Sequence, residues 1–303
     1  MNVLIVKLNA AGDVVRTTTL LRQLQGRITW ISAKENLPLL EGLIPSLRSM
    51  DWESRELAKD RTYDLIINLE DEIATAQFVA DVPYRRIFGA FLNAQGVVTY
   101  TEDSRRWFDM SLISMYGRKH ADQLKLENRR TYQEMIFEGL GLTFEGDPYH
   151  LPASVPTALS GDVAIAPVAG PVWPMKGWDH YEQLQKRLEN DGLKVNVLPR
   201  RPTILQHLGD VQQHQCLVCG DSLPMHLALG SGVRCITLFN CTSPWEIYDY
   251  GIQTKIVSPH LERFFYQRGL DPAATSAIEL EEVYQAVVKA LDCSVPSARR
   301  KHS

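Results

Sequence analysis

The sequence lacks the short motifs that identify several common enzyme classes. No G-x-G-x-x-G pattern follows a predicted strand, which disfavours an NAD-linked oxidoreductase, and there is neither a P-loop nor a G-x-S-x-G nucleophile elbow. Heptads, low-complexity tracts and tandem repeats are also missing. The formal net charge of -4 gives no reason to expect nucleic-acid binding. A functional assignment must therefore come from several weaker motifs considered together.

Long hydrophobic runs and a disulfide pattern are missing as well. The apolar run in residues 1–10 (MNVLIVKLNA) is too short to span a membrane, and no signal-peptide cleavage pattern follows it. The five cysteines are an odd number without a secretory signal, which indicates reduced thiols. With 303 residues, 45% of them hydrophobic, the chain can form two cores. We expect a cytoplasmic protein of two domains, with a loose basic tail at residues 297–303.

Short apolar runs alternate with helical patterns, which predicts an α/β fold with parallel sheets and crossover helices. Strands buried on both faces have nearly unbroken apolar sequences, and such runs are Val3–Leu8, Ile28–Ile31, Asp64–Leu69, Val163–Ala166, Val195–Leu198, Cys216–Cys219 and Cys235–Phe239. The predicted helices are Val14–Gln25, Tyr132–Leu140, Asp179–Asn190, Ser222–Leu229 and Leu280–Leu291. The proline-containing segment Asp147–Leu159 is the best linker candidate. We therefore predict two Rossmann-like domains, at residues 1–150 and 160–303.

Both halves contain the same local unit, in which an apolar strand runs into Gly-Asp and a helix follows. It is Gly12-Asp13 in the first half and Gly220-Asp221 in the second. In open α/β sheets, ligands bind outside the carboxyl ends of the strands. Two such halves facing one another would bring both aspartates and both helix N-termini to a common cleft.

Asp13 is the first candidate for chemistry. Small residues just before it, among them Gly12, would let a ligand approach the backbone closely. The alternative is that Asp13 is an ordinary helix N-cap, a position that aspartate prefers. The three β-branched residues Thr17–Thr19 are poor helix formers within the predicted helix. Their hydroxyls either line a polar pocket or bond back to the preceding turn.

Candidates for phosphate binding lie in the second half. Lys176 occupies a loop between a strand and a helix, where it either pairs with phosphate or is a surface lysine beside packing tryptophans. Asp221 would cap the next helix, whose first turn offers an anion the backbone amides of Ser222, Leu223 and Met225. His226 lies one turn further, where a lone histidine is more often structural. Thr242, Ser243 and Glu246 follow a predicted strand and either hold phosphate and sugar hydroxyls or form a polar turn.

Two other groups of residues have competing interpretations. The spacing of Cys216, Cys219, Cys235 and Cys241 superficially resembles that of a zinc site. Because the first pair lies in or beside an apolar strand, buried core thiols are the better interpretation. The basic and aromatic residues between Arg105 and Arg130 either grip an anionic ligand or form a solvated face.

Taken in order, four segments resemble glycosyltransferase family 9, whose best-known members are the ADP-heptose:lipopolysaccharide heptosyltransferases. VLIVKLNAAGDVVRTTTLL resembles the family's opening motif, and WPMKGW its phosphate-contacting segment. GDSLPMHLAL resembles its Asp-Ser/Thr-x-x-x-His helix start, and LFNCTSPWEIYDYG the segment that follows. Together they span nearly the whole chain, apart from about residues 91–130.

The resemblance implies a GT-B architecture, with an N-terminal acceptor-binding domain and a C-terminal nucleotide-sugar-binding domain. The terminal helix, about residues 280–291, would pack back toward the N-terminal domain. The resemblance also implies an inverting transfer without a cofactor or bound metal, in which Asp13 is the general base and Lys7 pairs with a carboxylate near it. Gly12, Thr17, Arg105 and Arg106 would support the acceptor side. The donor would be bound by Lys176, Asp221, Ser222, Met225, His226, Thr242 and Ser243.

The implied function is transfer of a heptose from ADP-heptose to a bacterial glycan such as the lipopolysaccharide inner core, at the inner face of the cytoplasmic membrane. The alternatives are the same chemistry on a protein or a small natural product, and a non-catalytic sugar-nucleotide-binding protein. Leu223-Pro224 replaces the Gly-Leu common in lipopolysaccharide heptosyltransferases, which leaves the donor sugar open. The segment His260–Pro272 lacks the cysteines that some family members carry there, which removes one reason to expect a metal.

Overall fold

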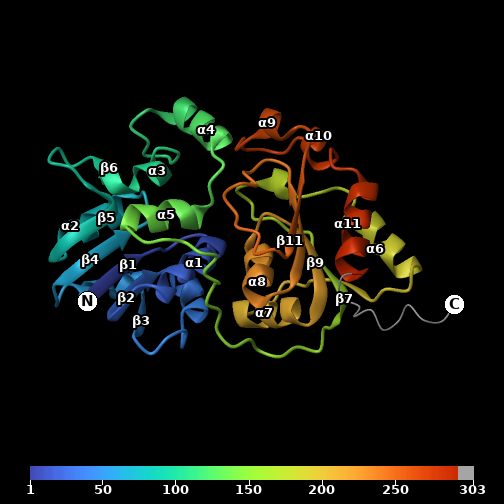
Figure 1. The fold of residues 1–303 in the computed structure, drawn as a ribbon, viewed down its shortest axis with the longest axis horizontal. Coiled ribbons are helices and arrows are strands. Elements are labelled where there is room, and N and C mark those ends of the chain that lie inside the picture. The colour runs from blue at the N-terminus through green and yellow to red at the C-terminus, as the bar shows by residue number, and fades with distance from the viewer. Residues whose placement is uncertain (293–303) are drawn as a thin grey trace. The chain divides into compact units, whose positions relative to one another are not determined.

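The chain forms two compact units (Figure 1). The structure, a computed structural model, describes residues 1–292, so the predicted basic tail at residues 297–303 lies outside it. One unit comprises Met1–Pro152 together with Trp245–Tyr248, and the other comprises Ala153–Pro244 and the chain from Asp249 onward. The short segment Trp245–Tyr248 thus belongs to the N-terminal unit although both of its neighbours in sequence belong to the C-terminal one. In residues 1–292 no helix combines the length and apolarity that crossing a membrane requires.

The N-terminal unit contains a six-stranded sheet in the order β3-β2-β1-β4-β5-β6. Its strands are β1 (Asn2–Val6), β2 (Arg27–Ser32), β3 (Leu47–Asp51), β4 (Tyr63–Asn68), β5 (Tyr84–Leu92) and β6 (Val98–Tyr100). All neighbouring strands run parallel except β5 and β6, which are antiparallel. The carboxyl ends of β1 and β4 lie side by side, with Val6 paired to Asn68. Residues that directly follow these two strands can therefore meet at one edge of the sheet.

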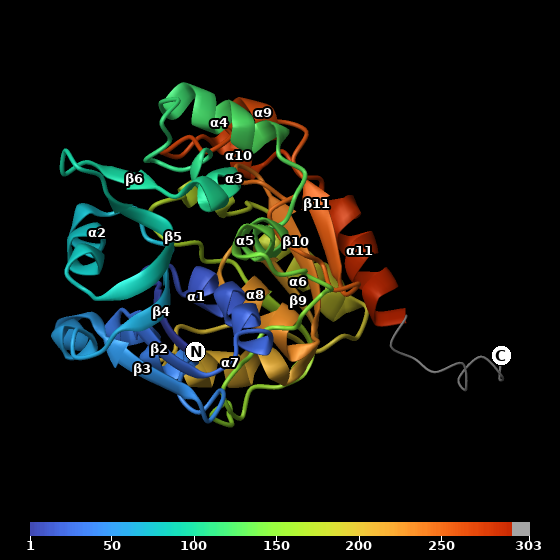
Figure 2. The same cartoon turned by 60° about the vertical axis from the view of Figure 1, so that its left-hand side comes forward.

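Helices cover both faces of this sheet (Figure 2). The α-helices are α1 (Ala11–Thr17), α2 (Ile73–Ala80), α3 (Arg105–Phe108), α4 (Arg118–Glu127) and α5 (Tyr132–Leu140), and the 3₁₀ helices are η1 (Thr18–Arg22), η2 (Lys34–Leu39), η3 (Trp52–Ala58) and η4 (Glu102–Ser104). Phe78 and Val79 of α2 pack with Leu4, Val6 and Ile66 in one core cluster. Alternate strand residues point to opposite faces, so Val3 and Ile5 face the side of α1 and α5.

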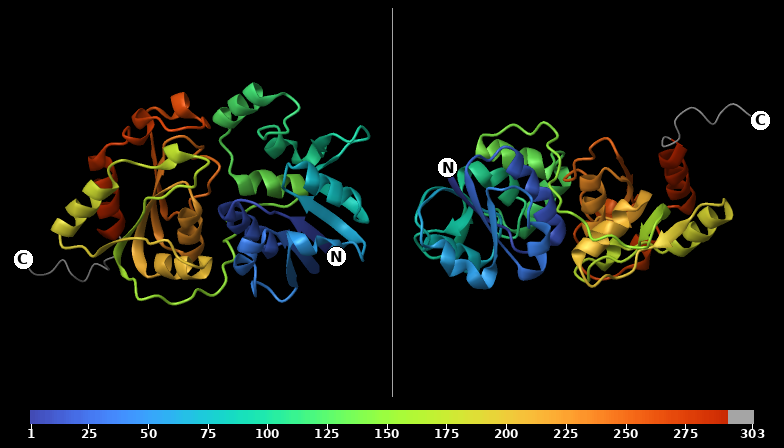
Figure 3. Two further views of the ribbon diagram at one scale, coloured as in Figure 1. Left: turned by 180° about the vertical axis from the view of Figure 1, so that it is seen from behind. Right: turned by 90° about the horizontal axis from the view of Figure 1, so that it is seen from below.

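The C-terminal unit contains a five-stranded parallel sheet in the order β11-β10-β9-β7-β8. Its strands are β7 (Gly161–Ala166), β8 (Val195–Val197), β9 (His214–Gly220), β10 (Arg234–Phe239) and β11 (Gln253–Val257). Its helices are η5 (Pro174–Lys176), α6 (Tyr181–Asn190), α7 (Ile204–Gln212), α8 (Leu223–Ser231), α9 (Leu261–Phe264), α10 (Pro272–Thr275) and α11 (Leu280–Asp292). Helices α6 and α11 cover one face of the sheet, and α7 and α8 the other (Figure 3).

The terminal helix packs its apolar face on its own sheet. Val283 and Val287 of α11 are fully buried in the core of the C-terminal unit, together with Leu184 and Leu188 of α6. The expected packing of this helix toward the N-terminal domain stays a prediction. An amphipathic helix buries its apolar stripe on the nearest exposed sheet face, which here belongs to the same unit.

The α/β class and the parallel sheets are confirmed, whereas several elements escaped prediction. The predicted helix Val14–Gln25 is in fact a short α-helix followed by a 3₁₀ helix, because the threonine run interrupts it. Strands β3 and β11 and helices α2 and α7 were not predicted from the sequence. The irregular region after residue 91 contains the β5–β6 hairpin, whose turn includes Gly96 at a φ of 72°.

Candidate active site

Asp13 lies in the first turn of α1, close to the carboxyl end of β1. Helix α1 begins at Ala11, and its N-cap residue is Ala10. Asp13 is therefore not the N-cap, which was the alternative interpretation of this residue. Ala10 has a φ of 56°, a left-handed conformation that costs a non-glycine residue about 1–2 kcal/mol. Its carbonyl accepts hydrogen bonds from the amides of Asp13 (2.7 Å) and Val14 (3.1 Å). A strained turn therefore fixes where the Asp13 backbone lies.

Three charged side chains gather around Asp13: Lys7, Arg16 and Glu70. Lys7 Nζ lies 3.7 Å from Asp13 Oδ2, and Arg16 Nη2 lies 2.9 Å from Asp13 Oδ1. Lys7 also pairs with Glu70 at 2.8 Å, and Glu70 accepts hydrogen bonds from the amides of Leu8 and Asn9. Burial alone would lower the pKa of Lys7, but Asp13 and Glu70 outweigh it and hold that pKa above its usual value. Lys7 thus makes the contact with a carboxylate that the resemblance implied.

Asp13 is the most accessible member of this cluster. Its side chain is 31% exposed, whereas the side chains of Lys7, Arg16 and Glu70 are 9%, 7% and 6% exposed. Buried charges persist in proteins when they are paired, and these are. The Asp13 carboxylate is therefore the group accessible to an incoming molecule. Lys7 and Arg16 contact it, and Glu70 in turn holds Lys7.

The threonines after Asp13 bond back to the helix. The hydroxyl of Thr17 donates to the Asp13 carbonyl at 2.6 Å and lies 2.7 Å from the Tyr132 hydroxyl. Thr18 and Thr19 donate to carbonyls three residues earlier, and all three are buried. Thr17 therefore does not line an open acceptor pocket, because its oxygen is already used inside the core. Gly12 lies half-exposed in the first turn, one residue before Asp13.

On the C-terminal unit, Lys176 and Asp221 form an ion pair. Lys176 Nζ lies 3.0 Å from Asp221 Oδ2, with the two side chains 17% and 15% exposed. Burial favours a higher pKa for Asp221, but Lys176 and His226 outweigh it and hold the pKa below its usual value. Gly220 lets the backbones of the two loops come close together, because a Cβ at this position would lie 2.4 Å from the Lys176 carbonyl oxygen.

The start of helix α8 differs from the prediction in two respects. The N-cap is Ser222, one residue later than expected, and the Asp221 carboxylate pairs with Lys176. The amide of Met225 donates to the Ser222 carbonyl at 3.0 Å, so the proposed role of Met225 as an anion donor is wrong. The amides of Ser222 and Leu223 precede the first intrahelical bond and remain suited to an anion. His226 is buried, with 4% exposure.

The loop after β10 places buried polar groups beside this pair. Thr242 and Ser243 are 1% and 2% exposed. Within residues 1–292, Ser243 Oγ and Asn240 Oδ1 are buried without a hydrogen-bond partner. The side-chain amide of Asn240 donates to the Gly177 carbonyl at 2.7 Å, which ties this loop to the one that carries Lys176. Buried polar atoms without a partner are uncommon and suit a site that binds a polar ligand.

A hollow of about 550 Å³ lies at the carboxyl ends of β7 and β8. It is lined by residues 166–171, 198–201 and 203–204, by His207, and by Leu223 and Pro224 at the start of α8. Its volume suits a small-molecule ligand. Arg201 is held by a bidentate contact with buried Asp210 at 2.6 and 2.8 Å. The sequence prediction missed this hollow because α7 and its approach carry no recognised motif.

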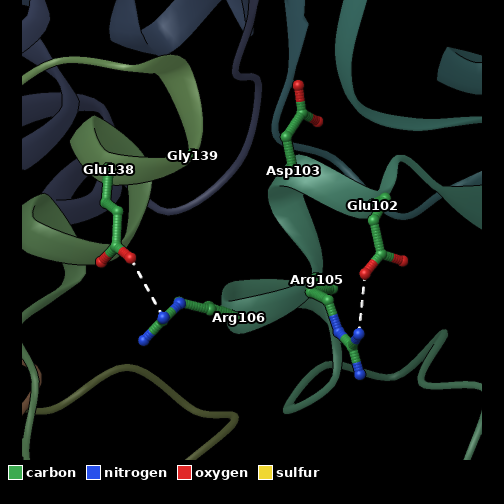
Figure 4. Close-up of a pocket in the computed structure, with 6 residues that line it drawn as sticks. All are labelled: Glu102, Asp103, Arg105, Arg106, Glu138 and Gly139. Atoms are coloured by element: carbon green, nitrogen blue, oxygen red, sulfur yellow. Dashed lines mark hydrogen bonds and ion pairs between the residues drawn. The ribbon is translucent and has the colours of Figure 1, made fainter.

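The basic region of the N-terminal unit is largely paired with carboxylates. Arg105 Nη1 lies 2.7 Å from Glu102, and Arg106 Nη2 lies 3.0 Å from Glu138 (Figure 4). These residues line a hollow of about 500 Å³, which Asp103 also lines. Three carboxylates and two guanidinium groups thus share this surface. The arrangement does not form the clustered basic face that an anionic acceptor would favour.

The cysteines of the C-terminal sheet are core thiols, as the sequence favoured. Cys216, Cys219, Cys235 and Cys241 are all fully buried and free. Burial raises the pKa of Cys216 and Cys219. Among residues 1–292, no three histidine, cysteine, aspartate or glutamate side chains gather in a way that could hold a metal ion.

Two further residues at these sites were not predicted from the sequence. Glu70 directly follows a predicted strand next to β1, and that position at the sheet edge could have identified it. Arg16 is three residues after Asp13, a spacing that places both on one face of a helix. Glu246 was a candidate together with Thr242 and Ser243, but its contact with Arg16 at 4.0 Å was not predicted, because the two residues are distant in sequence.

The two α/β units have the fold found in GT-B glycosyltransferases. Residues 174–269 match the family model of glycosyltransferase family 9 (heptosyltransferase). No curated protein sequence matches the chain. The family-model match over residues 174–269 and the shared fold of the solved structures agree with the resemblance to glycosyltransferase family 9.

Solved structures share the fold at low sequence identity. The E. coli heptosyltransferase WaaC with ADP-2-deoxy-2-fluoro heptose is 17% identical, with 95% of this chain and 99% of that chain covered and a TM-score of 0.62. E. coli ADP-heptose lps heptosyltransferase II is 16% identical, with coverages of 97% and 99% and a TM-score of 0.62. The iron-containing dodecameric glycosyltransferase TibC from enterotoxigenic E. coli H10407 is 10% identical, with coverages of 97% and 77% and a TM-score of 0.56.

Proposed function

We propose that this glycosyltransferase moves a heptose from ADP-heptose to a hydroxyl group of a glycan acceptor, with inversion at the anomeric carbon. The observation that carries the proposal is the family match, because residues 174–269 include every donor-side residue considered above. The structure of the similar WaaC with ADP-2-deoxy-2-fluoro heptose supports the choice of donor.

Asp13 is proposed as the general base. The acceptor oxygen forms a bond to the anomeric carbon while the bond from that carbon to the diphosphate oxygen breaks. The electron pair leaves with ADP, and the acceptor proton passes to Asp13. The 31% exposure of Asp13, within an otherwise buried cluster, supports this assignment. A positioned base contributes about 10²–10⁴-fold in rate.

The leaving diphosphate is proposed to be held by groups of the C-terminal unit, without a divalent cation. Lys176 supplies a positive charge that Asp221 orients at 3.0 Å. The first amides of α8 and the hydroxyls of Thr242 and Ser243 supply hydrogen bonds to the phosphate oxygens. Fixed donors of this kind stabilise the charge that develops on the leaving oxygen. His226 supports the ion pair through its effect on the pKa of Asp221.

The hollow at the ends of β7 and β8 is proposed to take the nucleoside of ADP. It is lined by Leu223 and Pro224 of the α8 start, so a nucleoside there would place its phosphates at the helix N-terminus. In open α/β sheets the ligand site lies at the carboxyl ends of strands, as this hollow does.

The acceptor proposed from the family is a lipopolysaccharide inner core, which would place the enzyme in the cytoplasm at the inner membrane. One observation favours a second class, an uncharged or amine-bearing small glycan. A hollow of about 300 Å³ in the N-terminal unit is lined by Asn9, which lies four residues before Asp13, and by Trp52. Its charged lining residues are four carboxylates and one cation: Glu35, Asp51, Glu53, Glu72 and Lys34. Carboxylates accept hydrogen bonds from sugar hydroxyls and attract amines, but they repel phosphate.

The test of the donor is calorimetric titration with ADP, GDP and UDP, followed by a transfer assay with ADP-heptose. We expect ADP to bind most tightly and ADP-heptose to be consumed. Preference for GDP or UDP would contradict the choice of donor.

The test of the acceptor is competition between a lipopolysaccharide core precursor and a neutral or amino-sugar oligosaccharide of similar size. Faster transfer to the lipopolysaccharide precursor would support the family acceptor, and faster transfer to the other would support the second class. Product analysis by NMR gives the anomeric configuration. Retention of that configuration would contradict the inverting mechanism.

A further inference from the structure

Arg16 is buried directly behind the proposed base. Helical spacing of three residues puts Asp13 and Arg16 on one face of α1, and Arg16 Nη2 lies 2.9 Å from Asp13 Oδ1. The Arg16 side chain is 7% exposed and Asp13 is 31% exposed, so Arg16 approaches the carboxylate from the protein side. This leaves the outward side of the carboxylate to an acceptor.

Two aromatic rings fix the plane of the Arg16 guanidinium. Its central carbon lies 4.0 Å from the centroid of the Tyr132 ring and 5.3 Å from that of Trp107. Tyr132 is itself held, because its hydroxyl lies 2.7 Å from Thr17 Oγ1. Cation–π contacts are strongest where the groups are desolvated, as they are here. Arg16 therefore has little freedom to follow a moving Asp13, and it restrains that residue.

Glu246 approaches Arg16 from the opposite end of the guanidinium. Glu246 Oε2 lies 4.0 Å from Arg16 Nη1, and the Glu246 carbonyl accepts a hydrogen bond of 3.0 Å from the amide of Tyr132. The neighbouring Trp245 lies under the guanidinium of Arg129 at 3.7 Å. The segment Trp245–Tyr248 is thus integrated into the N-terminal unit by both backbone and side-chain contacts.

The loop after β10 that carries Thr242 and Ser243, here called the donor loop, is followed almost at once by this segment. Only Pro244 and Trp245 separate Ser243 from Glu246. Ser243, whose buried hydroxyl has no partner in residues 1–292, is three positions before Glu246. A displacement of the Ser243 backbone on donor binding must therefore be absorbed between Ser243 and Glu246, or be passed on to Glu246 and from there to Arg16. Pro244 lies in this short connection and restricts the first option, because its ring fixes φ.

We propose that Arg16 is a positioning residue for Asp13, and that Glu246 links the orientation of Arg16 to the donor loop. The inference rests on the proposed base role of Asp13. Arg16 holds Asp13 Oδ1, so that the carboxylate keeps one orientation as it receives the acceptor proton, and the planar fork of Arg16 makes this contact directional. Lysine would keep the charge without the fork, and methionine would remove both.

The test compares Arg16→Met, Arg16→Lys and Glu246→Gln with the wild-type chain. The assay measures ADP release from ADP-heptose with the best acceptor of the competition experiment, and calorimetry measures ADP affinity. We expect Arg16→Met to lower kcat at least tenfold with unchanged ADP affinity, and Arg16→Lys to recover part of that loss. Glu246→Gln should lower kcat by a smaller factor. Arg22→Met is the matched control, since Arg22 contacts backbone carbonyls away from Asp13.

A double variant separates positioning from a general loss of structure. If Arg16 acts through Asp13, then Asp13→Asn combined with Arg16→Met is no slower than Asp13→Asn alone, because the residue being positioned is already disabled. Independent, multiplicative losses would overturn the inference while leaving the base role intact. Full activity of Arg16→Met would also overturn it. A wild-type chain that releases no ADP under any condition would overturn the proposed function itself.

Discussion

The two Gly-Asp units have the same local sequence pattern but different environments. In the N-terminal unit, helix α1 begins before Gly12, so Asp13 lies inside its first turn. In the C-terminal unit, helix α8 begins after Ser222, so Asp221 lies outside the helix. This difference in where the helix starts directs one carboxylate toward Lys7 and Arg16, and the other toward Lys176.

The two similar aspartates differ in burial and in their partners, and these differences separate their proposed roles. Asp13 is 31% exposed and Asp221 is 15% exposed. Asp221 keeps its charge because Lys176 and His226 hold its pKa low despite burial. A carboxylate that is fixed in this way suits the task of orienting a lysine, whereas the more accessible one suits proton transfer.

Substitution of Asp13 should have the largest effect on transfer activity. Asp13→Asn removes the base and keeps the shape, so transfer should fall about 100-fold or more. ADP affinity should not change, because the proposed donor residues all belong to the C-terminal unit. Enzyme kinetics and calorimetry measure the two quantities. Asp81→Asn, which affects only an exposed pair with Lys59, is the control. Unchanged turnover in Asp13→Asn would refute the base assignment.

Substitution of Lys176, the partner of Asp221, should have the second-largest effect, on ADP affinity. Lys176→Met removes the cation proposed to meet the diphosphate, and a charged hydrogen bond contributes about 1.5–3 kcal/mol. ADP affinity should therefore weaken about 10- to 100-fold in calorimetry. Lys186→Met is the matched control, since Lys186 pairs with Glu182 on the exposed face of α6. An unaltered dissociation constant would rule out the phosphate role of Lys176.

The third effect concerns the glycine that allows the Lys176–Asp221 pair to form. Gly220→Ala would place a Cβ 2.4 Å from the Lys176 carbonyl, so one of the two backbones must shift. We expect a loss of about 1–3 kcal/mol in the free energy of unfolding, measured by urea denaturation. Gly170→Ala is the control, because a Cβ there meets nothing within 4 Å. Equal stability of the two variants would contradict the close approach.

The fourth effect is a dependence on pH. The folded-state pKa of Asp221 lies below the unfolded value of 3.8, so its ion pair stabilises the fold above that pH. This stabilisation is lost as the pH falls through the folded-state pKa. Asp221→Asn should therefore lose stability less steeply than the wild-type chain as the pH falls below about 4. Urea denaturation across this range measures it. Identical slopes for both chains would show that Asp221 contributes nothing.

The sequence predicted the buried framework better than the environment of the proposed base. Strands such as β4 and β10 have mostly apolar sequences and were found because burial on both faces leaves a strong signal. The edge strands β3 and β11 are partly exposed, with a mixed composition that carries no such signal. The position of Asp13 was predicted, but its left-handed neighbour Ala10 was not, because alanine has no preference for that conformation.

Contacts between distant segments were out of reach of a single sequence. Glu70 is 63 residues from Lys7, and Glu246 is 230 residues from Arg16, so nothing local connects them. The assignment of Met225 failed for a different reason. Whether an amide at a helix start is free depends on the N-cap residue, and a shift of one position gave the Met225 amide an acceptor.

The smallest expected effect tests whether the N-terminal unit grips an anion. Arg106 is 57% exposed and lies 3.0 Å from Glu138, and exposed pairs contribute at most about 1 kcal/mol. Arg106→Gln should therefore change stability little, and should leave transfer to an uncharged acceptor within about twofold. The same assay with a phosphorylated acceptor sharpens the result. A tenfold or larger loss confined to that acceptor would show that Arg106 leaves Glu138 to bind phosphate, and would restore the anionic acceptor that the paired arginines now disfavour.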